Sequence, residues 1–248
     1  MKNTAQRKKW TSRIANASRP ALAGVFLAAL SSQFNATASD AGSASASISQ
    51  CTGVVSSHTV LVRLNNGRLQ TSVDSTHWTN CSLAVRTFFR AVTHDHGLFV
   101  AVGGSYLGEP GVIVTSTNGL AWTRRSSGTK NNLYRVAFGN GSFIAVGDSG
   151  AICTSEDGVV WKGQRSGSDT LLSAVAAGNN IFVVGGESGA ILTSTNGVNW
   201  SSGNIGLPIY VSHIAFDAGE FVIINRGTAF SSSNGLDWQR RAFRTAAE

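Results

Sequence analysis

The chain has 248 residues, 42% of them hydrophobic, and a formal net charge of +7 at neutral pH. Residues 1–38 hold six of the 20 basic residues and no acidic residue, so the rest of the chain has 14 basic against 13 acidic residues, or +1. A nearly neutral surface lacks the positive charge that nucleic-acid backbones require, and we expect no nucleic-acid partner.

Residues 1–38 have the pattern of a secretory signal peptide. A basic leader precedes an apolar run of ten residues, 21–30, and Ala36-Thr37-Ala38 is a small-x-small cleavage site. The apolar run is too short to span a bilayer. We therefore expect no membrane span in the mature chain, and a secreted or periplasmic protein.

Residues 39–50 are small and polar, which is typical of a flexible Ser/Ala-rich tether. The remaining part, 51–248, is long enough for one all-β domain. Cys51 and Cys81 flank its first repeat and can form a disulfide in an oxidising compartment, although the sequence leaves open whether they are bridged. Cys153 lies in an apolar alternating stretch, which predicts a buried thiol.

A seven-residue phrase, Ser-x-Asp/Asn-Gly-x-x-Trp, returns at a nearly constant spacing in this domain. Its tryptophans are 44, 39, 39 and 38 residues apart, and the first copy has Ser75 in place of the glycine. A period near 40 residues indicates a repeat architecture. The tryptophans of the five copies are Trp78, Trp122, Trp161, Trp200 and Trp238.

Each repeat predicts four short strands joined by Gly- and Asn-containing turns. In the third repeat we expect strands over 133–138, 143–147, 151–155 and 159–163. Four-stranded meanders repeated radially form a β-propeller, so we predict an all-β propeller of about five four-stranded blades. The sequence leaves open whether the blades close or form an open arc that dimerises through its edges. The predicted blades cover 51–83, 87–127, 132–166, 171–203 and 209–244.

The phrase also predicts its own turn. Its Asp or Asn side chain can accept hydrogen bonds from turn amides, and its glycine can adopt a positive φ. The tryptophan then packs between blades as a core residue. The acceptors in the complete copies are Asn118, Asp157, Asn196 and Asn234.

The phrase resembles the Asp-box of sialidase-like (BNR-repeat) propellers. The longer pattern Phe-x-x-Val-Gly-x-x-Gly-x-Ile-x-x-Ser-x-Asp-Gly-x-x-Trp, complete over 143–161, is similar to the repeats of photosystem II assembly-factor-like and WD40/YVTN/BNR-like secreted proteins. The copies are one residue shorter before the tryptophan than the usual Asp-box, and Asn replaces Asp in three of them. The resemblance therefore implies a propeller over about 51–245 and favours non-catalytic relatives over glycosidases.

Propellers usually place their sites on the face that carries the turns between second and third strands and the links between blades, here called the loop face. The turn of blade 2 has an insertion, 105–110, and loops that depart from a repeat often carry function. Ordinary polar turn residues are the alternative interpretation for Asp148 and Glu187. The ligand-binding candidates on this face are Tyr106, Glu109, Asp148, Glu187 and Arg226.

The sequence favours a non-catalytic binding or assembly scaffold with another protein as its partner. Glycoside hydrolysis requires two opposed carboxylates, and Asp148 and Glu187 recur at the repeat period, so repetition explains them without catalysis. His94 and His96 lack a distant ligand, so we expect no metal and no cofactor. The alternative hypothesis is a carbohydrate-binding lectin or a sialidase-like glycoside hydrolase.

Overall fold

The computed structural model describes residues 54–57, 60–83, 87–104 and 111–242. The signal peptide over 1–38, the tether over 39–50, and Cys51, Tyr106 and Glu109 lie outside the described residues, and their assignments stay predictions.

In the described residues twenty strands form five four-stranded antiparallel sheets, each a meander in chain order. Blade 1 has β1 (Val54–Ser56), β2 (Leu61–Asn65), β3 (Arg68–Ser72) and β4 (Thr79–Asn80). Blade 2 has β5 (Phe88–Asp95), β6 (Leu98–Gly104), β7 (Val112–Ser116) and β8 (Thr123–Arg125). Blade 3 has β9 (Leu133–Gly139), β10 (Ser142–Gly147), β11 (Ile152–Ser155) and β12 (Lys162–Gln164). Blade 4 has β13 (Leu172–Gly178), β14 (Ile181–Gly186), β15 (Ala190–Ser194) and β16 (Ser201–Asn204). Blade 5 has β17 (Ala215–Asp217), β18 (Glu220–Asn225), β19 (Thr228–Ser232) and β20 (Gln239–Ala242).

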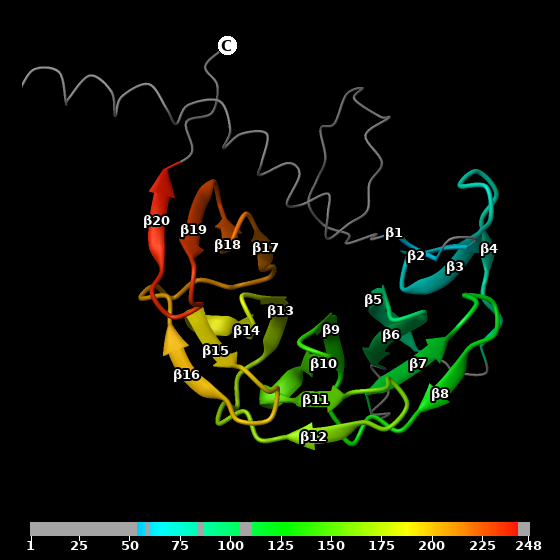
Figure 1. The fold of residues 1–248 in the computed structure, drawn as a ribbon, viewed down its shortest axis with the longest axis horizontal. Helices are drawn as coiled ribbons and strands as arrows, with labels where there is room; N and C mark the ends of the chain where they lie inside the picture. The colour runs from blue at the N-terminus through cyan, green and yellow to red at the C-terminus, as the bar shows by residue number, and fades with distance from the viewer. Residues whose placement is uncertain (1–53, 58–59, 84–86, 105–110, 243–248) are drawn as a thin grey trace, which may run out of the picture.

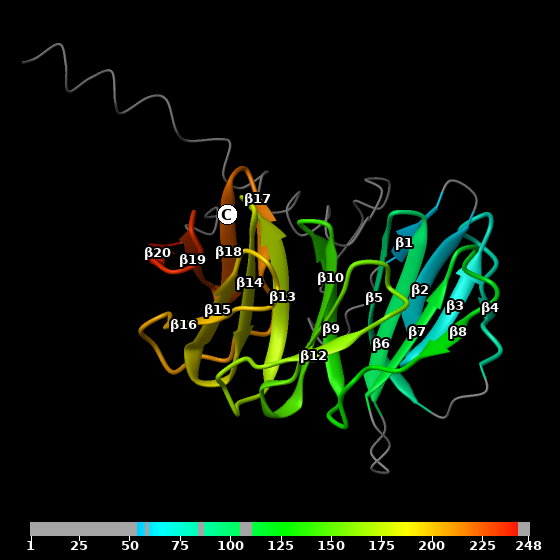
Figure 2. The same ribbon diagram turned by 60° about the horizontal axis from the view of Figure 1, so that its bottom comes forward.

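The blades follow one another along an arc, with the first strands near its centre and the fourth strands at its rim (Figure 1). Figure 2 shows blades 2 to 4 side by side along this arc. Two single turns of 3-10 helix, η1 (Asp148–Gly150) and η2 (Glu187–Gly189), join the second and third strands of blades 3 and 4. The prediction of five four-stranded blades is confirmed.

The second strand of each blade divides its side chains between two neighbours because successive strand residues point to opposite faces. Phe143 and Ala145 of β10 pack in an apolar cluster with blade 2, whereas Ile144 and Val146 pack in one with blade 4. A fully buried phenylalanine at this position, Phe143 or its equivalent Phe182, stabilises its interface by about 1.5–3 kcal/mol.

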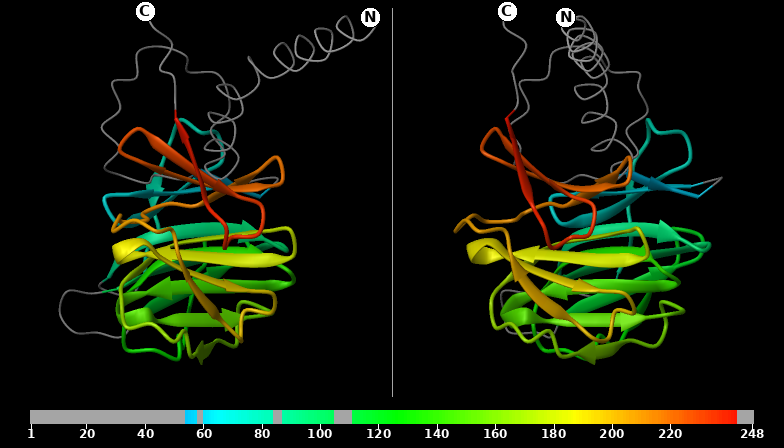
Figure 3. Two further views of the ribbon diagram at one scale, coloured as in Figure 1. Left: turned by 90° about the vertical axis from the view of Figure 1, so that its left-hand side faces the viewer. Right: turned by 60° about the vertical axis from the view of Figure 1, so that its left-hand side comes forward.

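The arc is open. Four apolar clusters lie in the described part of the chain, and they join blades 1 and 2, 2 and 3, 3 and 4, and 4 and 5. A closed ring of five blades would require a fifth interface, and no cluster of described residues joins blade 5 to blade 1. Figure 1 places these two blades on either side of the opening, and Figure 3 shows blade 5 (orange and red) next to blade 4 (yellow) at one end of the arc. Dimerisation of this open arc stays a prediction.

Charged and polar side chains lie on both end faces of the arc. In blade 1, Arg63 occupies the place that Ala145 has in blade 3; its Nε donates to Gln70 Oε1 at 3.0 Å and its guanidinium lies 4.0 Å from the Trp78 ring. In blade 5, Arg241 Nη2 and Glu220 Oε1 form an ion pair at 2.8 Å. Polar outer faces on terminal repeats keep a repeat array soluble.

The fourth strand of blade 3 begins later than the sequence predicts, at Lys162 instead of residue 159. The reason is the Asp-box turn, which extends through Trp161. Asp157 Oδ1 accepts hydrogen bonds from the Val159 and Val160 amides at 2.8 and 2.9 Å, and these bonds hold both residues in the turn.

Candidate functional site

The loop face carries η1, η2 and the links that lead into each first strand. Both turns approach a link closely through a glycine with positive φ. A Cβ on Gly150 (φ +67°) would lie 1.8 Å from the Ser168 carbonyl oxygen, and one on Gly189 (φ +72°) would lie 2.1 Å from that of Leu207. The turns therefore hold the links in place, and this fixes where each first strand begins.

The three described candidates from the sequence lie at equivalent turns of successive blades. Asp148 is half-buried, and its Oδ2 accepts a hydrogen bond from Asn132 Nδ2 at 3.0 Å. Glu187 and Arg226 are exposed. The structure places all three on the loop face at separate turns, and among the described residues it records no contact between them, so they form no joint site.

A polar cluster from three blades lies closer to the centre of the arc. Arg90 comes from β5, Tyr134 and Arg135 come from β9, and His213 comes from the link before β17. The Arg90 guanidinium lies 4.4 Å from the Tyr134 ring, and Arg135 Nη1 donates to the Arg90 carbonyl oxygen at 3.2 Å. These four residues, here called the central cluster, join blades 2 and 3 to the chain that enters blade 5.

The contact between Arg135 and His213 joins the two residues of this cluster that interact across the largest separation in sequence. Arg135 Nη2 lies 2.8 Å from His213 Nε2, and because a guanidinium only donates, the imidazole nitrogen accepts. The other nitrogen, Nδ1, lies 3.1 Å from Ser212 Oγ and carries the proton in this assignment. Burial and then the Arg135 charge lower the pKa of His213 from 6.5 to about 4. His213 is therefore neutral at physiological pH.

We expect this neutral histidine to make the fold sensitive to acid. The folded-state pKa is lower than the unfolded-state value, so between pH 6.5 and about 4 the unfolded chain binds a proton that the folded chain does not. The unfolding free energy should fall by about 2 kcal/mol between pH 7.5 and 5 through this group alone. Chemical denaturation of wild type and His213→Gln at both pH values measures this loss, and equal losses in the two proteins would contradict the assignment.

The link from blade 4 to blade 5 brings apolar side chains to the same face. It runs from Ile205 to Ile214 and exposes Leu207 and Tyr210, whose exposed fractions are 42% and 46%. Asn225 Nδ2 donates to the Tyr210 carbonyl oxygen at 3.0 Å and attaches the link to blade 5. An exposed aromatic residue beside charged turns is typical of a protein-binding surface.

Sequence reasoning missed the central cluster and this link. One signal was present: Arg135 and His213 stand where the first strand of blade 4 has Ala174, so they depart from the repeat. A second signal was the length of the fourth link, which places Pro208 and Tyr210 between two regular repeats.

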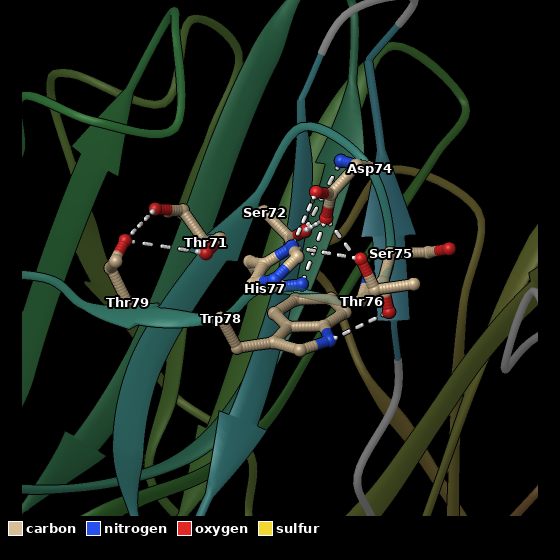
Figure 4. Close-up of polar contacts among 8 residues, drawn as sticks. All are labelled: Thr71, Ser72, Asp74, Ser75, Thr76, His77, Trp78 and Thr79. Atoms are coloured by element: carbon tan, nitrogen blue, oxygen red, sulfur yellow. Dashed lines mark hydrogen bonds and ion pairs between the residues drawn. The ribbon is translucent and has the colours of Figure 1, made fainter.

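The Asp-box turns lie on the opposite side of the blades. Their side chains form hydrogen bonds within the turn, which indicates a structural role. In the first copy, Asp74 Oδ1 accepts from the Thr76 and His77 amides at 2.9 and 2.8 Å, and Trp78 Nε1 donates to the Ser75 carbonyl oxygen at 3.0 Å (Figure 4). The backbone bond from His77, followed by its side-chain bond, holds the pKa of Asp74 well below its usual range.

The complete copies repeat this geometry. Their Asp or Asn Oδ1 atoms accept two turn amides each, and their indole nitrogens donate to the carbonyl oxygen of the Asp-box glycine at 2.8–3.1 Å. Trp161 is buried, and the other three indoles are half-buried against the preceding blade. The residues in this arrangement are Asn118, Asp157, Asn196 and Asn234 with Trp122, Trp161, Trp200 and Trp238.

Cys81 and Cys153 form no disulfide within the described part of the chain. Cys81 is half-buried, and burial raises its pKa; its predicted partner, Cys51, lies outside the described residues, so the disulfide stays a prediction. Cys153 is buried between blades 2 and 3, and burial raises its pKa to about 12. Such a thiol is inert as a nucleophile at neutral pH.

His94 and His96 lie on the Asp-box side. His94 packs on Phe99 with ring centroids 4.3 Å apart, and His96 packs on Phe138 at 4.5 Å. Within the described ranges, no three His, Cys, Asp or Glu side chains gather as a metal site would require. The same part of the chain contains no helix long and apolar enough to cross a membrane.

No protein-family model and no curated protein matches the sequence. Among solved structures the chain is similar to "YCF48 bound to D1 peptide", with a TM-score of 0.58 and 17% identity over 76% of this chain and 67% of that chain. It is also similar to virginiamycin B lyase from Staphylococcus aureus, with a TM-score of 0.67 and 11% identity over 79% and 70% of the two chains. A third similar structure is the WD40 β-propeller domain of Doa1, with a TM-score of 0.58 and 15% identity over 77% and 68%. At these identities the likeness shows the fold alone, which is a β-propeller.

Proposed function

We propose that this protein is a binding or assembly scaffold that holds a protein partner on its loop face. A segment of the partner that carries a carboxylate occupies the central cluster. The observation that carries this proposal is the meeting of Arg90, Tyr134, Arg135 and His213, from three parts of the chain, near the centre of the arc. Each belongs to a rigid strand or a fixed link, so the cluster is organised before a ligand arrives.

The chemistry of the cluster favours an anionic ligand. Arginine guanidinium groups recognise carboxylates through paired, charge-assisted hydrogen bonds. His213 stays neutral above its pKa of about 4, so the positive charge of the cluster comes from Arg90 and Arg135. Two guanidinium groups in one cluster produce a positive potential there.

The part of the loop face around the central cluster suits a protein partner more than a small molecule. Tyr210 and Leu207 offer exposed apolar contact area, and Glu187 and Arg226 add charges of both signs beside it. Aromatic and arginine side chains are enriched at protein interfaces. One structural neighbour has been solved with a peptide bound, which supports the view that this fold can present a peptide site.

The same proposal places the protein outside the cytoplasm. The basic leader, the ten-residue apolar run and the small-x-small site over 1–38 support export by a secretory signal. A scaffold in the periplasm or the medium would meet its partner there.

Selection from a displayed library of random peptides tests the proposed function. Immobilised wild-type protein should enrich peptides that are rich in Asp and Glu or end in a free carboxylate. The same selection on Arg90→Ala/Arg135→Ala, shown folded by circular dichroism, should not enrich them. A library without enrichment, or equal enrichment on both proteins, would contradict a carboxylate site in the central cluster.

A further inference from the structure

A groove of about 220 Å³ opens between blades 3 and 4 on the Asp-box side, away from the central cluster. Buried Thr154 and Ser155 lie at its floor, and half-buried Ser142 and Gln164 lie along one wall. Exposed side chains surround its mouth: Glu156, Asp157, Val160, Lys162, Asn196 and Val198.

Ser142 explains why the groove opens at this interface. It is the first residue of β10, and the corresponding residues of β6 and β14 are Leu98 and Ile181. Leu98 packs under the next Asp-box, where a Cβ on Gly158 would lie 2.4 Å from its Cδ2 atom. Between blades 3 and 4 the equivalent space is filled by Ile144, whose Cδ1 atom would lie 2.6 Å from a Cβ on Gly197. The short Ser142 side chain leaves the outer part of this interface open as the groove. The groove is thus a local departure from the repeat.

The groove wall is organised by hydrogen bonds within the fold. Gln164 Nε2 donates to Thr154 Oγ1 at 2.8 Å, and this bond leaves the Gln164 carbonyl oxygen as an acceptor and the threonine hydroxyl as a donor. The Asp-box turns are fixed as well, because Asp157 Oδ1 and Asn196 Oδ1 each accept two turn amides. These hydrogen-bonded side chains therefore lose little entropy when a ligand binds.

The chemistry of these groups matches a neutral sugar. Hydroxyl, amide and ammonium groups line the groove and can bond to sugar hydroxyls, which both donate and accept. Val160 and Val198, one from each wall, offer aliphatic contact for the C–H face of a ring. Glu156 and Asp157 outnumber Lys162, so the groove disfavours acidic sugars. Its volume lies below the roughly 300–1,000 Å³ of pockets for drug-sized ligands, and one ring fits such a space.

We propose that the groove between blades 3 and 4 binds a single neutral saccharide unit of a glycan. This site is separate from the loop face and does not depend on the protein-binding function. One chain could therefore hold a protein partner on one face and a glycan on the other.

A glycan array probed with the full chain tests this proposal. Binding to neutral glycans and not to sialylated or other acidic ones is expected. Titration of the best-bound neutral monosaccharide, followed by NMR, should then show at least a tenfold weaker affinity for Ser142→Leu. This variant places the leucine of blade 2 in the groove, and its thermal midpoint should equal or exceed that of wild type.

Two further variants keep the test decisive. Gln164→Ala removes a groove acceptor without filling the space and should also weaken binding, so the proposal remains testable if Ser142→Leu does not fold. Arg135→Ala alters the opposite face and should bind the sugar as wild type does. A blank array with folded protein, a preference for acidic glycans, or binding that Ser142→Leu and Gln164→Ala leave unchanged would each overturn the proposal. Loss of peptide enrichment on Arg90→Ala/Arg135→Ala would not bear on it.

Discussion

The Trp161→Ala variant should lose about 3–5 kcal/mol of unfolding free energy, as expected for the truncation of a buried aromatic side chain. Trp161 is only 6% exposed and lies in the apolar cluster that joins blades 2 and 3. Its ring centroid is 6.3 Å from that of Phe143, and its Nε1 donates to the Gly158 carbonyl oxygen at 2.8 Å. Truncation removes this contact area and leaves a cavity between two blades.

The matched control is Trp78→Ala. Trp78 occupies the same position in blade 1 and makes the same turn bond, at 3.0 Å to Ser75, but no described blade packs against it and it belongs to none of the four clusters of described residues. Its main partner is Arg63, and a cation–π contact at an exposed site contributes about 0.5–1 kcal/mol. Urea denaturation of both variants measures the difference. Equal losses would mean that these tryptophans act only within their own turns.

The Gly150→Ala variant should lose about 2–5 kcal/mol of unfolding free energy, for two reasons that add. Gly150 has φ +67°, which costs an L-residue roughly 1–2 kcal/mol. The new Cβ would also lie 1.8 Å from the Ser168 carbonyl oxygen, so the link between blades 3 and 4 must move, at a cost of about 1–3 kcal/mol. That movement would break the hydrogen bond from the Gly150 amide to the Thr170 carbonyl oxygen at 2.7 Å.

Gly141→Ala separates the two contributions. Gly141 lies in the same blade with φ +76°, and a Cβ there would meet nothing within 4 Å. This variant should therefore lose only the roughly 1–2 kcal/mol of the backbone conformation. Thermal or chemical denaturation of both proteins provides the comparison. A Gly150→Ala protein as stable as Gly141→Ala would show that the link is not fixed by this close approach.

Much of the fold could be predicted because the repeat combines turn chemistry and strand pattern at fixed offsets. Asn140-Gly141 and the Asp-box around Asp157 mark the ends of short apolar strands, and β9 to β11 begin and end within one residue of the predicted bounds. The fourth strand was misplaced because periodicity cannot reveal that an aspartate side chain extends a turn to Trp161. The number of blades followed from the number of phrases.

The open arc and the central cluster could not be predicted from the same pattern. Closure depends on the angle between blades, which no single repeat contains. Arg63 in the place of Ala145 was a signal, because a charged side chain in a closed interface between blades would lose its solvation. The contact between Arg135 and His213 joins residues 78 positions apart, and it exists only because the arc brings β9 towards the link before β17.

Two of the predicted ligand residues, Tyr106 and Glu109, and one predicted disulfide partner, Cys51, lie outside the described residues. Asp148, Glu187 and Arg226 reach the predicted face, but repetition places them at separate turns. The residues that come together are those that depart from the repeat. When a site is predicted in a repeat protein, residues that depart from the repeat should therefore receive more weight than polar turn residues that recur in every repeat.

The most direct test of a protein-binding loop face is the affinity of one selected acidic peptide for three proteins: wild type, Arg135→Ala and Lys162→Ala. Both variants remove one positive charge, but Arg135 lies in the central cluster and Lys162 lies on the opposite side. Calorimetric titration should give at least a tenfold weaker affinity for Arg135→Ala and an unchanged affinity for Lys162→Ala. Equal affinities for all three proteins, or a loss only in Lys162→Ala, would contradict a carboxylate site at the centre of the loop face.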